Sequence, residues 1–238
     1  MSGHSKWHNI QARKGKQDAV KANIFTKLAK GITIAAQRGG DPATNFSLRL
    51  AIDKAKAASM PKDNIERAIK RGSGEEEGVH MDEIVYEAFC PGGAAMMIKT
   101  ITDNRNRTFP ELKHIMSKHD GSMAGEGSVR WMFSYVGSIH LSLASVSNRD
   151  SMELAVIEAG ADDVTVQDDT LVVIVKPERF QAMIAECKKN GFTIESAELV
   201  WIAKESIVVP EEARPALEAL CAELDEHDDV EDYFINAA

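Results

Sequence analysis

Ser73-Gly74-Glu75-Glu76-Glu77-Gly78 divides the 238-residue chain into two parts of different composition. Glycines beside a run of carboxylates disfavour a packed element and are typical of a linker. Residues 1–72 contain 15 Lys and Arg against 5 Asp and Glu, whereas residues 73–238 contain 13 against 32. The net charge of −9 for the whole chain therefore hides a basic first part and an acidic second part. We expect a domain boundary at this stretch.

Three amphipathic helices are predicted before the boundary. Apolar residues recur at helical spacing from Gln17 to Arg38, and Gly39-Gly40-Asp41-Pro42 ends that segment. A second helix follows around residues 48–55, and a third runs from Pro61 to Gly72 with cations in its last turn. The first 16 residues are polar and basic without apolar periodicity, and we expect them to be a mobile arm when unbound.

Mixed strands and helices are predicted after the boundary. Two strands, 84–89 and 94–102, flank the turn Pro91-Gly92-Gly93, and a helix over 107–119 and a strand over 128–135 follow. The next residues give the order β-α-β-β-α-β over positions 137–202, which is typical of a ferredoxin-like arrangement. A helix from Pro210 and a strand over 230–235 are left over after this unit.

The predicted fold class is therefore α+β, with an N-terminal three-helix domain and two α/β sandwich domains, one of them ferredoxin-like and inserted in the other. The predicted domain bounds are residues 1–75 for the basic arm and helices, 80–135 plus 206–238 for the discontinuous α/β domain, and 136–205 for the inserted domain.

The basic first part predicts a polyanion as partner, because Lys and Arg neutralise phosphates and release condensed counterions. Residues 1–38 contain 8 basic side chains and 1 acidic one, which an ordinary solvated helix explains poorly. The candidate nucleic-acid-binding residues are His4, Lys6, Trp7, Arg13, Lys14, Lys16, Lys21, Lys27, Lys30, Arg38, Arg105 and Arg107.

Three of these candidates, Trp7, Arg105 and Arg107, have alternative roles. Trp7 either stacks on a base or anchors the arm against the helices. The polar loop Thr102-Asp103-Asn104-Arg105-Asn106-Arg107-Thr108 either binds phosphate or forms a turn shaped by Asp103 or Asn104. In the second case Asn106 or Thr108 caps the following helix, and both arginines are solvated or paired.

Several chemistries are not indicated. His4 and His8 have the spacing of metal ligands but lack a third ligand nearby, and the carboxylate run 225–232 does not match a Ca²⁺ loop and is interpreted as solvated. Residues 121–127 match neither a P-loop nor a dinucleotide fingerprint, and we interpret them as a flexible loop. The three cysteines contain no C-x-x-C pair. We therefore expect no enzyme activity, cofactor, metal or small-molecule substrate.

A membrane location is not indicated either. The sequence has no stretch near the roughly 20 apolar residues of a membrane span. Its first residues lack the apolar core of a signal peptide. We therefore expect a cytoplasmic protein with no membrane partner.

Ordered motifs along the whole chain resemble one family. They include Gly3-His4-Ser5-Lys6-Trp7, Ile24-Phe25-Thr26-Lys27-Leu28, Met60-Pro61-Lys62-Asp63-Asn64-Ile65, the loop 102–108 and Gly127-Ser128-Val129. The chain resembles the YebC/PmpR family, which includes the mitochondrial translational activator of cytochrome c oxidase subunit I. The resemblance implies three domains with the last inserted into the middle one, and no catalysis.

The resemblance implies two possible functions. The first is a DNA-binding transcriptional regulator, and the second is a ribosome-associated factor that relieves stalling at proline-rich stretches. Their partner would be DNA or ribosomal RNA, and the sequence shows no recognition-helix signature. A third hypothesis is a protein-interaction adaptor whose basic domain docks on an acidic partner or on the acidic half of the same chain.

Overall fold

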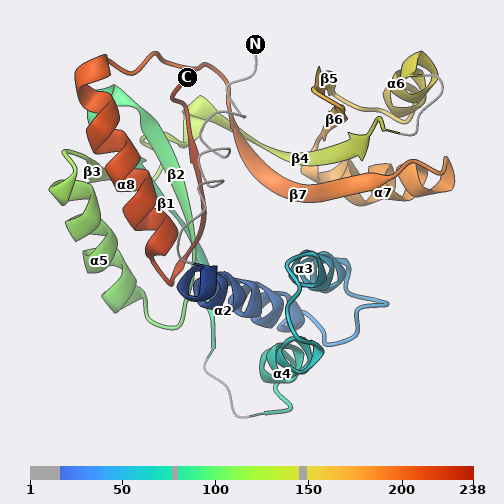
Figure 1. The fold of residues 1–238 in the computed structure, drawn as a ribbon, viewed down its shortest axis with the longest axis horizontal. Coiled ribbons are helices and arrows are strands. Elements are labelled where there is room, and N and C mark those ends of the chain that lie inside the picture. Colours follow the sequence, from blue (N-terminus) through green and yellow to red (C-terminus); the bar gives the residue numbers. More distant parts are fainter. Residues whose placement is uncertain (1–16, 77–79, 145–148) are drawn as a thin grey trace. The chain divides into compact units, whose positions relative to one another are not determined.

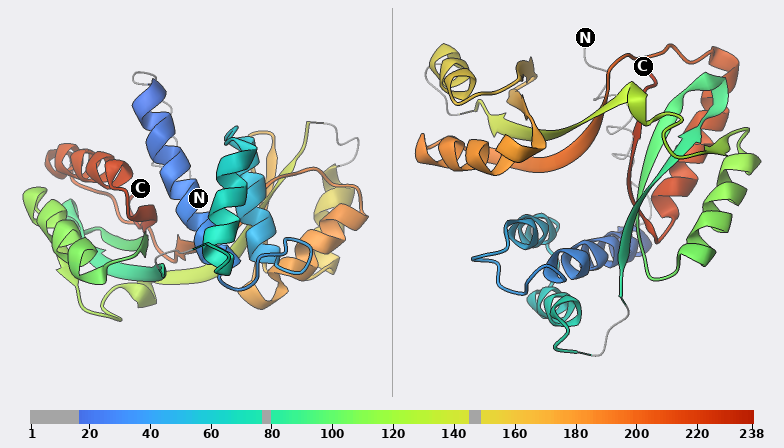
Figure 2. Two further views of the ribbon diagram at one scale, coloured as in Figure 1. Left: turned by 90° about the horizontal axis from the view of Figure 1, so that it is seen from below. Right: turned by 180° about the vertical axis from the view of Figure 1, so that it is seen from behind.

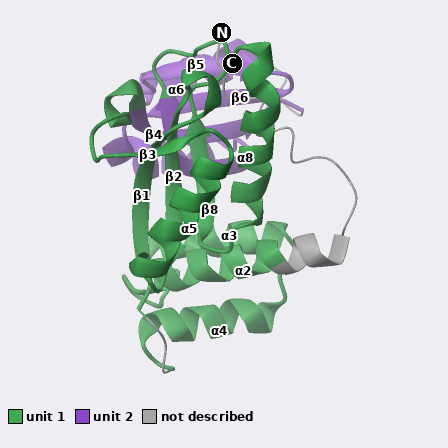
Figure 3. Cartoon of the chain, turned by 90° about the vertical axis from the view of Figure 1, so that its left-hand side faces the viewer, with its two compact units in different colours: residues 1–133, 203–238 green, residues 134–202 purple. Residues whose placement is uncertain are grey.

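The computed structural model describes residues 17–76, 80–144 and 149–238, with side chains from Asn23 onward. The chain forms two units, residues 1–133 with 203–238 and residues 134–202 (Figure 3). The second unit is thus inserted in the sequence of the first. The first unit contains both the helical region and one sheet, so the predicted division into three domains stays a prediction.

The helical region consists of α2 (Gln17–Ala36), α3 (Phe46–Ala57) and α4 (Lys62–Ser73), as predicted. Helices α3 and α4 both pack on α2 (Figures 1 and 2). Asn45 begins α3, because its side chain accepts a hydrogen bond from the Leu48 backbone N–H at 3.1 Å. Apolar side chains of all three helices form a buried core that includes Ile32, Leu48, Ile52, Ile65 and Ala68.

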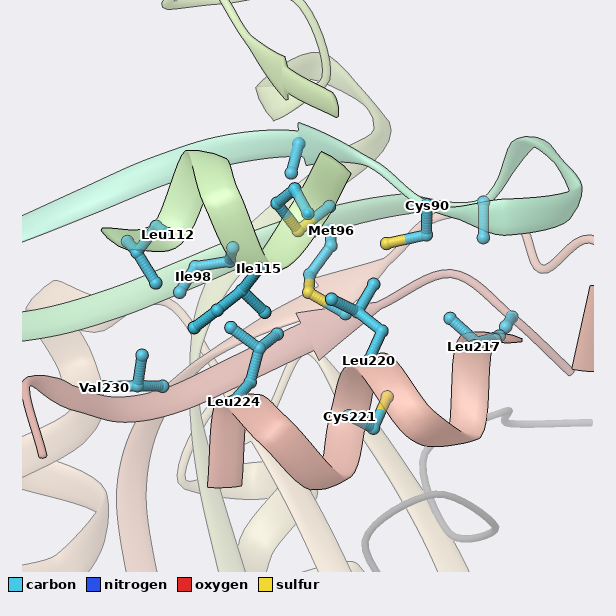
Figure 4. Close-up of a cluster of buried hydrophobic side chains, with 14 of the residues drawn as sticks. Cys90, Met96, Ile98, Leu112, Ile115, Leu217, Leu220, Cys221, Leu224 and Val230 are labelled. Atoms are coloured by element: carbon cyan, nitrogen blue, oxygen red, sulfur yellow. The ribbon is translucent and has the colours of Figure 1, made fainter. Parts of the chain in front are cut away.

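The first sheet is antiparallel and has the strand order β3-β1-β2-β8. Its strands are β1 (Asp82–Phe89), β2 (Ala95–Thr102), β3 (Ser122–Ala124) and β8 (Val230–Ile235). Helices α5 (Arg105–Lys118) and α8 (Arg214–Glu226) cover one face of it. Figure 4 shows their apolar side chains meeting those of β2, among them Met96, Leu112 and Leu220.

A tight turn joins β1 to β2 through the short 3-10 helix η2 (Pro91–Gly93). Gly92 has φ 74°, a left-handed conformation that glycine adopts without steric cost. A Cβ atom at this position would lie 2.9 Å from Cγ1 of Val209, so the site also requires glycine for space. The turn at the end of the β1–β2 hairpin therefore packs tightly against Val209, in the segment that precedes α8.

The second unit has the predicted order β-α-β-β-α-β. Its elements are β4 (Phe133–Ser142), α6 (Arg149–Glu158), β5 (Asp163–Gln167), β6 (Thr170–Val175), α7 (Phe180–Lys189) and β7 (Ile194–Ala203). The strand order is β5-β6-β4-β7. The antiparallel pairing of β6 with both β5 and β4 is that of the split βαβ arrangement. The α+β fold class is therefore as predicted.

The predicted strand over 128–135 is wrong for residues 128–132 and is confirmed only for residues 133–135. Residues 130–132 form the 3-10 helix η3 (Arg130–Met132), and β4 begins at Phe133 and continues to Ser142. The cause is the buried carboxylate of Glu87 on β1, which accepts hydrogen bonds from the backbone N–H groups of Gly127, Val129 and Arg130. These bonds bend the chain where its residue types favour an extended strand.

The predicted flexible loop over 121–127 contains strand β3, which pairs with β1. Short 3-10 turns, η4 (Pro177–Arg179) and η5 (Glu211–Ala213), precede α7 and α8. Among the described residues, no helix combines the length and the apolar character needed to cross a membrane.

Candidate nucleic-acid interface

Lys27 and Lys30, two predicted nucleic-acid contacts on α2, lie against the acidic segment 225–229 of the same chain. Lys27 donates from Nζ to the backbone oxygen of Asp225 at 2.6 Å. Lys30 donates to the backbone oxygen of Asp228 at 2.9 Å and forms a 2.5 Å ion pair with Oδ1 of Asp229. One turn before Lys27, Asn23 donates to the backbone oxygen of Glu226 at 3.0 Å. This face of α2 is therefore bound within the protein.

The acidic segment attracts these donors because it includes the end of α8. The last carbonyl groups of a helix have no partner within the helix and carry partial negative charge. Burial lowers the pKa of Lys27, and this effect outweighs the carboxylates of Asp225, Asp228 and Asp232, which raise it. Lys27 therefore serves as a partly buried donor to a helix end rather than as a fully solvated cation.

Asp229 is the centre of this contact, with only 2% of its side chain exposed. Its Oδ2 accepts hydrogen bonds from Arg107 Nη2 at 2.7 Å and from the hydroxyl groups of Thr108 at 2.7 Å and Thr102 at 3.2 Å. Burial raises the pKa of this carboxyl group, but bonds from Arg107, Lys30 and Thr108 outweigh burial and hold it far below its ordinary value. The carboxylate thus ties α2 to the end of β2 and the start of α5.

The loop 102–108 forms the turn and helix cap that the sequence allowed as an alternative. Asn104 caps α5, because its side chain accepts from the backbone N–H groups of Asn106 and Arg107. Arg105 pairs with Asp82 at 3.0 Å, and Arg107 pairs with Asp103 at 3.0 Å besides Asp229. Both arginines predicted to bind phosphate are thus held by carboxylates, and the capping residue is Asn104 rather than Asn106 or Thr108.

A cleft of about 710 Å³ lies beside this contact in the first unit. Its lining includes Lys30 and Arg107 as well as Glu111 and Glu226. His227 also lines it: its Nδ1 accepts from the backbone N–H of Asp229 at 3.1 Å, and its Nε2 lies 3.3 Å from Oε2 of Glu111. Positive and negative groups both line the cleft, and several of them pair with one another, which does not favour a phosphate ligand.

Most cations of the described helical region are exposed. The exposed basic residues between 23 and 72 are Arg38, Arg49, Lys54, Lys56, Lys62, Arg67, Lys70 and Arg71, and the exposed acidic residues are Asp41, Asp53, Asp63 and Glu66. Arg38, in the turn just after α2, is therefore a predicted contact that remains at the surface of the described residues. His4, Lys6, Trp7, Arg13, Lys14, Lys16 and the side chain of Lys21 lie outside the described residues.

The sequence interpretation missed Asp229, because a run of carboxylates is usually solvated. Two features of the sequence could have indicated a buried carboxylate. Thr102 and Thr108 place hydroxyl donors on either side of the Asn104 cap, and the carboxylate run 225–232 lies between a predicted helix and a predicted strand. Across the described ranges, no cluster of three or more His, Cys, Asp or Glu residues could hold a metal ion.

Comparison with known proteins agrees with the resemblance drawn from the motifs. Two family models match, the TACO1/YebC protein N-terminal domain over residues 5–75 and the TACO1/YebC second and third domain over residues 81–237. A protein of Nitrosococcus oceani is 48% identical over 240 residues, covering 100% of this chain and 96% of that one. A protein of Pseudothermotoga lettingae is 45% identical over 237 residues, covering 99% and 93%. Both relatives are named "Probable transcriptional regulatory protein".

A solved structure has the same fold. The crystal structure of a conserved hypothetical protein from Aquifex aeolicus matches with a TM-score of 0.84 and 36% identity, covering 96% of this chain and 95% of that one. Both family models and these relatives together span nearly the whole sequence. The chain therefore belongs to the TACO1/YebC family.

Proposed function

We propose that this protein is a non-enzymatic, cytoplasmic regulator of gene expression that binds DNA through its basic N-terminal region. The observation that carries the proposal is the charge of the exposed helical surface. Eight basic residues and four acidic ones are exposed between residues 23 and 72, in a chain whose net charge is −9. The relatives' name, probable transcriptional regulatory protein, supports the same function.

The binding mode follows from the kinds of side chain on this surface. Lys and Arg contact phosphates, which position a protein on nucleic acid without reading its sequence. The affinity would therefore fall steeply with salt and depend little on base sequence. The sequence specificity of such a regulator would have to come from DNA shape or from a partner.

The same chemistry supports a ribosome-associated translation factor as the second candidate. Phosphate contacts suit structured ribosomal RNA as well as duplex DNA, because both present dense negative charge. The contact of α2 with segment 225–229 favours one form of the adaptor hypothesis, in which basic side chains bind the acidic half of the same chain.

The test is sedimentation of the full chain with ribosomes and polysomes across a salt series, beside binding to promoter-length duplex DNA. The DNA proposal predicts selective duplex binding with no ribosome association. Salt-sensitive migration with ribosomes and unselective DNA binding would instead support the translation factor. Binding to neither, with capture of an acidic protein that free RNA and DNA do not displace, would support the adaptor.

A further inference from the structure

Three cations on the outer face of α4 have no acidic partner among the described residues. Arg67, Lys70 and Arg71 are exposed, and within the described ranges their side chains form no ion pair or hydrogen bond. The opposite face of α4 is buried through Ile65 and Ala68. Helix α4 is therefore fixed on the other helices with these three cations directed to solvent.

The buried side of α4 makes a close contact with α2. The hydroxyl group of Thr33 on α2 donates to the backbone oxygen of Ala68 at 3.3 Å. At Gly72 the helices approach so closely that an added Cβ would meet the backbone oxygen of Thr33 and lie 2.7 Å from Cβ of Ala36. The backbone that carries the outer face is consequently fixed by packing, which lowers the backbone entropy lost when it binds a ligand.

Several other cations of the first unit are held by partners within the chain. Lys30 is paired with the buried Asp229, Arg105 is paired with Asp82, and the guanidinium of Arg49 donates to the backbone oxygens of Pro42 and Ala43. A phosphate that recruited Lys30 would leave a buried carboxylate without its partner, which is costly. A phosphate that binds an unpaired exposed cation only releases counterions.

The spacing of the three cations places them together. Positions 67, 70 and 71 are related by three and four residues, so the side chains share one face of the helix. Like charges at this spacing destabilise a helix. Asp63 stands four residues before Arg67 and Glu66 four residues before Lys70. Neither forms an ion pair with these cations among the described residues, and Glu66 pairs with Lys62 at 3.3 Å. The helix dipole favours cations in the last turn but does not require a third cation one turn earlier.

We propose that Arg67, Lys70 and Arg71 on the outer face of α4 bind the phosphate backbone of nucleic acid. Lys27 and Lys30 instead hold α2 on the acidic segment 225–229. This inference rests on the proposed function. Within the described helical region, it assigns the contact with nucleic acid to the outer face of α4 and not to the face of α2 that carries Lys27 and Lys30.

The test compares two triple variants of the full chain. Arg67→Gln/Lys70→Gln/Arg71→Gln removes the α4 cations. Lys113→Gln/Lys176→Gln/Lys188→Gln removes three other exposed lysines and changes the net charge equally. Glutamine preserves the helix propensity at the helical positions, and Lys176 lies in an exposed connection outside any helix. Circular dichroism checks that both variants are folded, and fluorescence anisotropy measures binding to a mixed-sequence DNA duplex and to an RNA hairpin across a salt series.

The α4 variant is expected to bind about tenfold more weakly or worse, and the control is expected to match the wild-type protein. On duplex DNA, the slope of log affinity against log salt should fall by about 2 to 3, since each phosphate contact contributes about 0.9. If the wild-type protein binds and the two variants bind equally, the α4 surface is refuted and the proposed function stands. If the wild-type protein binds neither probe, both are refuted.

Discussion

Replacing Asp229 by Asn tests whether the buried carboxylate holds the helical region on the first sheet. The substitution keeps the size of the side chain and removes its charge. In the structure this charge faces Lys30, whose side chain is 17% exposed, and Arg107, whose side chain is 45% exposed. Lys30 would be left partly buried without its ion pair, whereas Arg107 would be hydrated.

The magnitude follows from these exposures. Removing one partner of a fully buried ion pair costs about 3–5 kcal/mol. Because Lys30 is only partly buried and Arg107 is exposed, we expect the lower end, about 3 kcal/mol. With a urea slope of about 2 kcal/mol/M, the unfolding midpoint should fall by about 1.5 M.

The assay is urea unfolding followed by circular dichroism, with Asp228→Asn as the matched control. Asp228 is the adjacent residue and its side chain is exposed, so the control should lose less than about 0.5 kcal/mol. If the two variants unfold within about 1 kcal/mol of each other, the reasoning about the Asp229 contact is wrong.

The pH dependence gives an independent check. The pKa of Asp229 lies below its ordinary value in the folded protein. Its stabilisation is therefore fully present above the unfolded pKa of about 3.9 and is lost as the pH falls toward the lower folded pKa. The wild-type protein should lose its stability advantage over Asp229→Asn progressively below about pH 4.

Three further predictions concern other parts of the fold. Gly72→Ala should destabilise the chain by about 1–3 kcal/mol, because the added Cβ would meet the backbone of Thr33. The control Gly125→Ala should be nearly neutral, since its Cβ has space. Hydrogen exchange across α4 should be faster in the Gly72 variant alone. Burial raises the pKa of Glu87, but the backbone N–H groups of Val129, Gly127 and Arg130 outweigh it and give a lowered pKa. The stabilisation by the Glu87 carboxylate is thus present above about pH 4.3 and is lost as the pH falls further. At neutral pH, Glu87→Gln should speed the hydrogen exchange of the backbone N–H groups in residues 127–132. Equal exchange in the variant and the wild type would contradict this role. Burial raises the pKa of the Cys221 thiol to about 12 and that of Cys187 to about 11, so a thiol reagent at neutral pH should modify both only after denaturation.

Most of the fold could be predicted from local sequence patterns. Strands β5 and β8 have the predicted bounds, and the three helices of the first part begin and end within a few residues of the predicted positions. Hydrophobic periodicity and Gly or Pro breaks are local signals, and they suffice where packing follows them.

The errors arose where distant residues determine the local structure. Glu87 on β1 bends residues 127–130, about forty positions later, by accepting their backbone N–H groups. Asp229 fixes Lys30 through a contact across 199 positions, so a lysine that belongs to a basic face by sequence is turned inward. No window of sequence contains both partners of either contact.

The most direct test of the central claim is cross-linking of the full chain to duplex DNA and to ribosomal RNA, with the linked residues identified by mass spectrometry. The account predicts links in the N-terminal region, with Lys70 on α4 linked and Lys27 and Lys30 unlinked. Links concentrated in residues 134–202, or at Lys27 and Lys30 instead of α4, would contradict it.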